Sequence, residues 1–87
     1  MNKKQRQTLA NLFEKPERSD IPWIDIEGLL KALGAEVSEG SGSRVRVAYK
    51  GCKAVFHRPH PEPEANKSAV KSVRRFLEET EVNNDGI

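Results

Sequence analysis

The sequence has a single cysteine, few aromatic residues and no long apolar run. One cysteine, Cys52, cannot form a disulfide within the chain, which favours a reducing compartment such as the cytoplasm. No apolar run approaches the roughly 18 residues of a membrane-spanning helix. The basic residues of the opening MNKKQRQ are not followed by the apolar core of a signal peptide. The sequence therefore predicts a cytoplasmic protein that does not enter a membrane.

The charge is high in amount but nearly balanced in sign. Charged residues make up 32% of the 87 residues, apolar residues make up 36%, and the formal net charge is +2. Such a composition is typical of one soluble domain with a small core and a charged surface. Because this excess attracts polyanions only weakly, the positions of the cations matter more than their sum.

The spacing of apolar residues changes along the chain from a helical to a strand period. From Ile26 to Leu33 they follow the i, i+3, i+4, i+7 spacing of a helix, and Gly34 is placed to end it. Asn66 is a candidate N-cap for the last helix. The expected helices cover residues 3–14, 23–33 and 66–80, and the expected strands cover 35–39, 44–49 and 52–57. The sequence thus predicts an α+β fold with the order helix, helix, strand, strand, strand, helix.

The last two expected strands form a hairpin whose pairing can be read from its turn. A two-residue loop at Lys50 and Gly51 directs the alternating apolar residues to the core face. The same pairing places Arg44 directly opposite His57 on the solvent face, where opposed Cβ atoms lie about 4.5–5.5 Å apart. A slip of one residue would bury the arginines, so the pairing is strongly specified.

Both histidines of the chain lie in the short stretch AVFHRPHP, at residues 54–61. An imidazole titrates near neutral pH and can accept a proton and later return it. RNA cleavage needs such a base and acid, together with cations that stabilise the charge growing on the phosphorane. The candidate catalytic residues are therefore His57, His60, Arg44 and Arg58. The prolines on either side of His60 fix the backbone and lower the entropic cost of holding it in place.

Other interpretations of this stretch remain. A histidine at a strand end is often a polar cap or a packing residue. His57 and His60 have the spacing of two zinc ligands, but a zinc site needs three or four, and Cys52 is expected to face the core. We therefore expect no metal and no small-molecule cofactor.

A second group of cations is a candidate for contacting an RNA backbone. At 100° per residue, Lys67, Lys71 and Arg74 share an arc of the last helix opposite its apolar stripe. Arg46 and Lys53 lie on the solvent face of the hairpin. An ordinary solvated helix face is the alternative interpretation of the helical cations.

The segments DIEGLLKALGAEV, GSR, VRV, VFHRPHP and VKSVRRFLEE together resemble the HicA family of bacterial toxins over residues 23–82. We expect a single HicA-like domain over residues 1–87, with a core over residues 23–82 and residues 1–15 as a helical extension. The terminal residues 83–87 are expected to fray. The resemblance implies a fold like that of double-stranded-RNA-binding domains, with a three-stranded antiparallel sheet and helices on one face. The implied activity is cleavage of messenger RNA, which inhibits translation, and the implied partner is a HicB-like antitoxin.

The sequence departs from the family at one position. Many members have GSH, with a catalytic histidine, where this chain has Gly42, Ser43 and Arg44. Either the catalytic role has moved across the hairpin to His57, with His60 assisting, or this branch has lost cleavage. The resulting hypothesis is a metal-independent endoribonuclease toxin of a type II toxin–antitoxin system. The alternative is a non-catalytic RNA-binding module.

Overall fold

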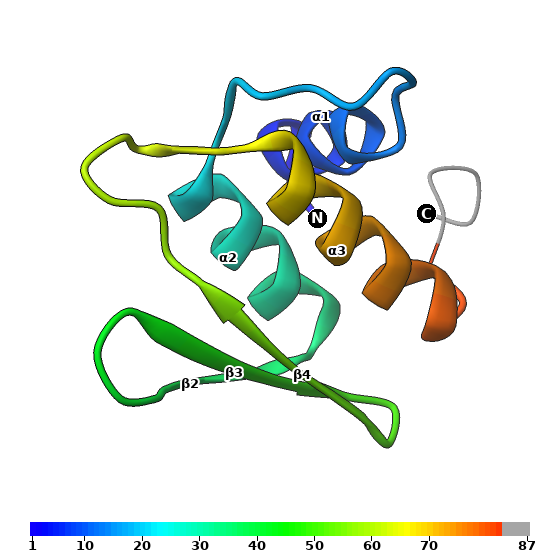
Figure 1. The fold of residues 1–87 in the computed structure, drawn as a ribbon. Coiled ribbons are helices and arrows are strands. Elements are labelled where there is room, and N and C mark those ends of the chain that lie inside the picture. Colours follow the sequence, from blue (N-terminus) through cyan, green and yellow to red (C-terminus); the bar gives the residue numbers. More distant parts are fainter. Residues whose placement is uncertain (83–87) are drawn as a thin grey trace.

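The structure is a computed structural model that describes residues 1–82 of the chain. Its elements are α1 (Lys3–Leu12), β1 (Ile21–Pro22), α2 (Trp23–Leu33), β2 (Glu36–Glu39), β3 (Arg44–Tyr49), β4 (Cys52–His57), β5 (Glu64–Ala65) and α3 (Lys67–Glu79) (Figure 1). The expected α+β class and element order are confirmed, with two short strands added. The tail expected to fray, residues 83–87, lies outside the described residues. Within residues 1–82 no helix is long and apolar enough to cross a membrane.

The hairpin has the pairing expected from the sequence. β2, β3 and β4 form an antiparallel sheet in the order β2-β3-β4. Lys50 and Gly51 have φ values of 49° and 78°, so both turn residues are left-handed, as a two-residue hairpin that matches the twist of its strands requires. Arg44 pairs with His57, and Val45 pairs with Phe56. Local turn geometry therefore fixes which side chains share a face.

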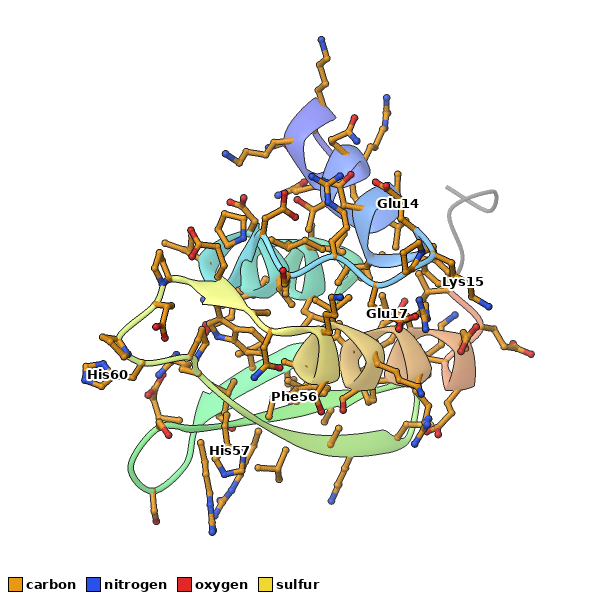
Figure 2. The ribbon with its side chains drawn as sticks, turned by 45° about the horizontal axis from the view of Figure 1, so that its top comes forward. Glu14, Lys15, Glu17, Phe56, His57 and His60 are labelled. Atoms are coloured by element: carbon orange, nitrogen blue, oxygen red, sulfur yellow. The ribbon has the colours of Figure 1, made fainter. Side chains whose placement is uncertain are left out.

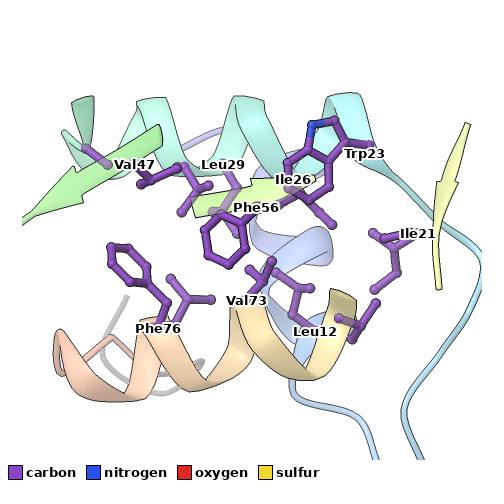
Figure 3. Close-up of a cluster of buried hydrophobic side chains, with 14 of the residues drawn as sticks. Leu12, Ile21, Trp23, Ile26, Leu29, Val47, Phe56, Val73 and Phe76 are labelled. Carbon is purple, nitrogen blue, oxygen red and sulfur yellow. The ribbon is translucent and has the colours of Figure 1, made fainter. Parts of the chain in front are cut away.

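Helices cover one face of the sheet. Figure 1 shows α2 and α3 on the same side of the three strands, and α1 beyond them. Phe56 points into this layer, with ring centroids 6.1 Å from Trp23 and 6.0 Å from Phe76 (Figure 3). The opposite face, which carries Arg44 and His57, is exposed to solvent.

The ends of two helices follow the sequence signals. α2 ends at Gly34, whose φ of 100° is a left-handed conformation that glycine adopts without strain. α3 begins after Asn66, whose side-chain oxygen accepts a hydrogen bond of 2.8 Å from the backbone N–H of Ala69. Both caps were expected from the sequence. They determine where α2 ends and where α3 begins, and therefore where the adjoining loops start and end.

A short two-stranded ribbon closes the loop that contains His60. Ile21 in β1 pairs with Ala65 in β5, and the backbone N–H of Trp23 donates a 2.8 Å hydrogen bond to the carbonyl oxygen of Pro63. Strands of two residues are too short to show an alternating pattern, so no local signal predicted them. The ribbon ties the far end of the loop to the start of α2.

The N-terminal extension is part of the core. Leu9 and Leu12 of α1 are almost completely buried in the same apolar cluster as α2 and α3. The following linker continues over α3, where Figure 2 labels Glu14, Lys15 and Glu17. α1 is therefore a structural element of this chain and not a loose appendage.

Candidate functional site

Arg44 and His57 lie side by side at one end of the exposed sheet face. Arg44 is the first residue of β3, His57 is the last residue of β4, and the two are directly paired. The backbone N–H of Arg58 donates a 2.9 Å hydrogen bond to the carbonyl oxygen of Ser43, which fixes the strand ends just beyond this pair. Both side chains are exposed. An imidazole and a guanidinium are thus presented together to solvent, as the sequence predicted.

A hollow of about 380 Å³ begins at His57 and extends along the loop that follows it. His57, Arg58 and His60 line it, together with Asn66 at the start of α3. Figure 2 shows the two histidines pointing in different directions, His57 below the sheet and His60 off the tip of its loop. The structure therefore brings both histidines to one hollow from different sides, but it does not place their rings face to face.

Arg58 is held by two carboxylates from different elements. Its Nε donates a 2.8 Å hydrogen bond to Oε2 of Glu27 in α2, and its Nη1 donates a 2.6 Å hydrogen bond to Oε1 of Glu39 in β2. The indole N–H of Trp23 also donates to Glu27. Arg58 is thus the bridge between the start of the His60 loop, α2 and the edge of the sheet. Its hydrogen bonds to these carboxylates use four of the five N–H donors of the guanidinium, so one donor of Nη1 is left for a phosphorane.

These ion pairs change the titration of all three groups. Hydrogen bonds from Arg58 lower the pKa of Glu27, more than burial raises it, and they lower the pKa of Glu39 in the same way. In turn, the hydrogen bonds to Glu39 and Glu27 raise the pKa of Arg58 above its ordinary value. All three groups therefore remain ionised at neutral pH.

We expect Glu27→Gln to lower stability at neutral pH and to have little effect in acid. The folded-state pKa of Glu27 is depressed, so its contribution is present above the unfolded-state pKa of about 4.3 and is lost as pH falls through the folded-state value. Urea unfolding of the wild type and the variant at pH 7 and pH 3 measures this. The two midpoints should differ most at pH 7, and the difference should be smaller at pH 3. A constant difference at both pH values would show that the ion pair contributes nothing.

The expected RNA-contacting cations do not form one surface. Arg46 and Lys53 are exposed on the open face of the sheet, where they line a shallow hollow of about 420 Å³. Lys67 and Lys71 are exposed on α3, which packs on the other face of the sheet. The cations therefore form two groups separated by the sheet.

The expectation that Arg74 is a solvent-facing member of the α3 stripe is wrong. Arg74 is only 7% exposed, and its Nη2 donates a 2.7 Å hydrogen bond to Oε2 of Glu17 in the linker after α1. This bond lowers the pKa of Glu17. A helical wheel shows the angle between Arg74 and the apolar stripe of α3. It does not show that a segment distant in the sequence covers Arg74. Arg74 thus fastens the N-terminal extension to α3.

Comparison with known protein families assigns the chain. The family model described as "HicA toxin of bacterial toxin-antitoxin" matches residues 23–82. The chain belongs to the HicA toxin family. A HicA toxin is one component of a toxin–antitoxin system and has an antitoxin as its partner. No curated protein and no solved structure gives a significant match to the chain.

The match to the HicA family includes the whole candidate site. Arg44, His57, the His60 loop and the carboxylates that hold Arg58 all lie within the matched segment, whereas α1 lies before it. In this HicA toxin, the imidazole of His57 is the direct neighbour of Arg44 across the hairpin.

The carboxylates of this HicA toxin were not found by sequence reasoning. Glu27 and Glu39 are separated from Arg58 by 31 and 19 positions, and no local pattern identifies such a pairing. Within residues 1–82, no group of three or more histidine, cysteine, aspartate or glutamate side chains is placed to hold a metal ion. Cys52 packs against the core, as expected.

Proposed function

We propose that this HicA toxin is an endoribonuclease that cleaves messenger RNA in the bacterial cytoplasm without a metal ion. The observation that supports the proposal best is the pairing of Arg44 with His57 on an exposed sheet face. In this pair, His57 can carry a proton and Arg44 is permanently charged. The resemblance to the family implies a catalytic histidine at the position of Arg44. The neutralising partner in this proposal is a HicB-like antitoxin.

In the proposed reaction, an imidazole accepts the proton of a ribose 2′-hydroxyl, and the 2′-oxygen attacks the adjacent phosphorus. The bond from phosphorus to the 5′-oxygen then breaks, and the leaving oxygen receives a proton. His57 is the main general acid/base, and His60 assists from the other side of the shared hollow. Arg44 stabilises the negative charge on the phosphorane.

Incubation of purified toxin with RNA in the presence of EDTA tests this proposal. Fragmented RNA is expected, and expression of the toxin alone should arrest growth and fragment transcripts in the cell. Fragmentation that occurs only with added divalent metal would contradict a metal-independent reaction.

A non-catalytic RNA-binding module is the second candidate, because the family histidine of GSH is replaced by Arg44 in this chain. The fold that the family implies recognises RNA by its shape and backbone. RNA that is bound firmly but never cut, with or without EDTA, would favour this second function over the first.

Both functions predict that the open face of the sheet binds the RNA backbone. We expect Arg46→Ala to weaken RNA binding and to reduce the salt slope of log K by about 0.7–0.9, the value for one lost phosphate contact. Filter binding over a series of salt concentrations measures both quantities. Arg6→Ala removes the same charge from the exposed surface of α1 and is the matched control. Equal effects of the two variants would mean that only overall charge matters.

A further inference from the structure

The outer edge of β4 is an unpaired strand edge. β4 is the last strand in the order β2-β3-β4. In a hairpin with a two-residue turn, the residues next to the turn, Tyr49 and Cys52, form a hydrogen-bonded pair, and the pairs alternate from there. The backbone N–H and C=O groups of Lys53 and Val55 therefore point away from β3. Within residues 1–82 they form no further backbone hydrogen bonds. Such an edge is a template for an added strand.

A groove runs along this edge between β4 and α3. It encloses about 210 Å³. Figures 1 and 2 both show α3 lying along β4 on the core side of the sheet. Phe56 and Phe76, which meet edge to face, contribute apolar surface to the groove. The lining residues are Lys53, Ala54, Val55, Phe56, Ser72, Arg75, Phe76 and Glu79.

We propose that the antitoxin adds an extended segment to the free edge of β4 and places an acidic side chain beside Arg75. Family membership shows that an antitoxin exists, and the edge and groove show how an extended chain can bind. Main-chain hydrogen bonds to Lys53 and Val55 give affinity, and the groove selects the side chains. Half-exposed Val55, at 54%, is one of the two large apolar residues that the described chain leaves exposed, and it lies in the middle of this edge.

The charges of the groove favour an acidic segment over a second copy of this chain. Two cations line the groove, Arg75 on α3 and Lys53 at the strand edge, whose side chain points toward the open face of the sheet, and Glu79 balances one charge near the end of α3. Two copies joined through β4 would bring the cations of both grooves together, which is unfavourable. An acidic side chain of a partner meets the remaining positive charge and improves the match.

The position of the added strand suggests how binding silences the toxin. A strand that pairs with Lys53 and Val55 continues along β4 to His57, the last residue of the strand. RNA and the antitoxin would then compete for the end of the sheet. This consequence rests on the proposed function of His57, whereas strand addition itself does not.

Amide hydrogen exchange on the full-length toxin tests the proposal. The free toxin is compared with its complex with the protein encoded by the neighbouring reading frame. The amides of Lys53 and Val55 should exchange at least about tenfold more slowly in the complex. Those of Ala54 and Phe56, which already face β3, should change less. Rapid exchange of Lys53 and Val55 in the complex would overturn the proposal, as would concentration-dependent protection in the toxin alone, which would indicate a second copy.

Two substitutions at Val55 separate the backbone from the side chain. Val55→Pro removes the outward N–H, and Val55→Thr keeps it with a similar shape. Val55→Pro should weaken the complex at least tenfold, whereas Val55→Thr should bind nearly as well as the wild type. A circular dichroism spectrum and a cooperative thermal transition of the Val55→Pro toxin show that it folds. Unchanged binding by such a folded variant would overturn the proposal.

A charge reversal in the groove provides a variant that keeps the backbone intact. Arg75→Glu should weaken the complex, and Arg6→Glu on α1 is its matched control. If both variants bind the antitoxin as tightly as the wild type does, the proposed acidic side chain beside Arg75 is wrong. RNA cleavage by the free toxin is measured separately, so failure of strand addition is distinguishable from failure of the proposed nuclease.

Discussion

His57→Ala should abolish the growth arrest caused by this toxin and lower its RNA cleavage by about 10²–10⁴-fold, the usual contribution of a general acid or base. The structure supports this prediction because His57 is exposed and directly paired with Arg44. The fold should not suffer, since the imidazole lies outside the core. Growth of induced cultures and the cleavage rate of a defined RNA, with a circular dichroism spectrum to verify folding, measure the effect.

His60→Ala is the matched control for this prediction. His60 lines the same hollow but points off the tip of its loop (Figure 2). We expect its loss to reduce cleavage less than the loss of His57. Growth arrest by a folded His57→Ala toxin at the level of the wild type would remove His57 from the mechanism. Equal losses in both variants would mean that the two imidazoles act as one unit.

Phe56→Ala should destabilise the fold by about 3–5 kcal/mol, the usual cost of replacing a buried phenylalanine by alanine. Phe56 is 7% exposed and lies between Trp23 and Phe76, so its removal leaves a cavity at the centre of the core (Figure 3). At about 4–8 °C per kcal/mol for a domain of this size, Tm should fall by roughly 12 °C or more. Since such domains have a total stability of only about 5–15 kcal/mol, a large part of it would be lost.

The adjacent residue provides the control for this stability prediction. Val55 alternates to the other face of β4 and is 54% exposed. Val55→Ala should therefore change Tm by only a few degrees. Scanning calorimetry or thermal circular dichroism compares the two variants. Similar shifts for both would contradict the assignment of the two faces of the sheet.

Local sequence signals predicted the parts of the fold that depend on neighbouring residues. The turn at Lys50 and Gly51 set the pairing of β3 and β4, and with it the contact between Arg44 and His57. The spacing of apolar residues and the cap residues predicted the ends of α2 and α3 to within about one residue of the observed ends. In each case, a few adjacent side chains determine the geometry.

Contacts between distant residues were not predicted. Arg74 and Glu17 are separated by 57 positions, and Arg58 and Glu27 by 31. No periodicity encodes which carboxylate a long cationic side chain will reach after the chain has folded. The expected solvent-facing position of Arg74 was therefore wrong, while the catalytic roles of the residues around His57 remain predictions.

The way in which α1 is attached decides what a shortened chain would expose. The segment that matches the family begins at Trp23, yet Leu9 and Leu12 fill the space against α2 and α3, and the Arg74–Glu17 ion pair secures the linker. A chain that began at Trp23 would expose the apolar surface that these leucines cover and would leave the guanidinium of Arg74 without its carboxylate. The matched segment of this chain therefore does not hold the whole of its own core.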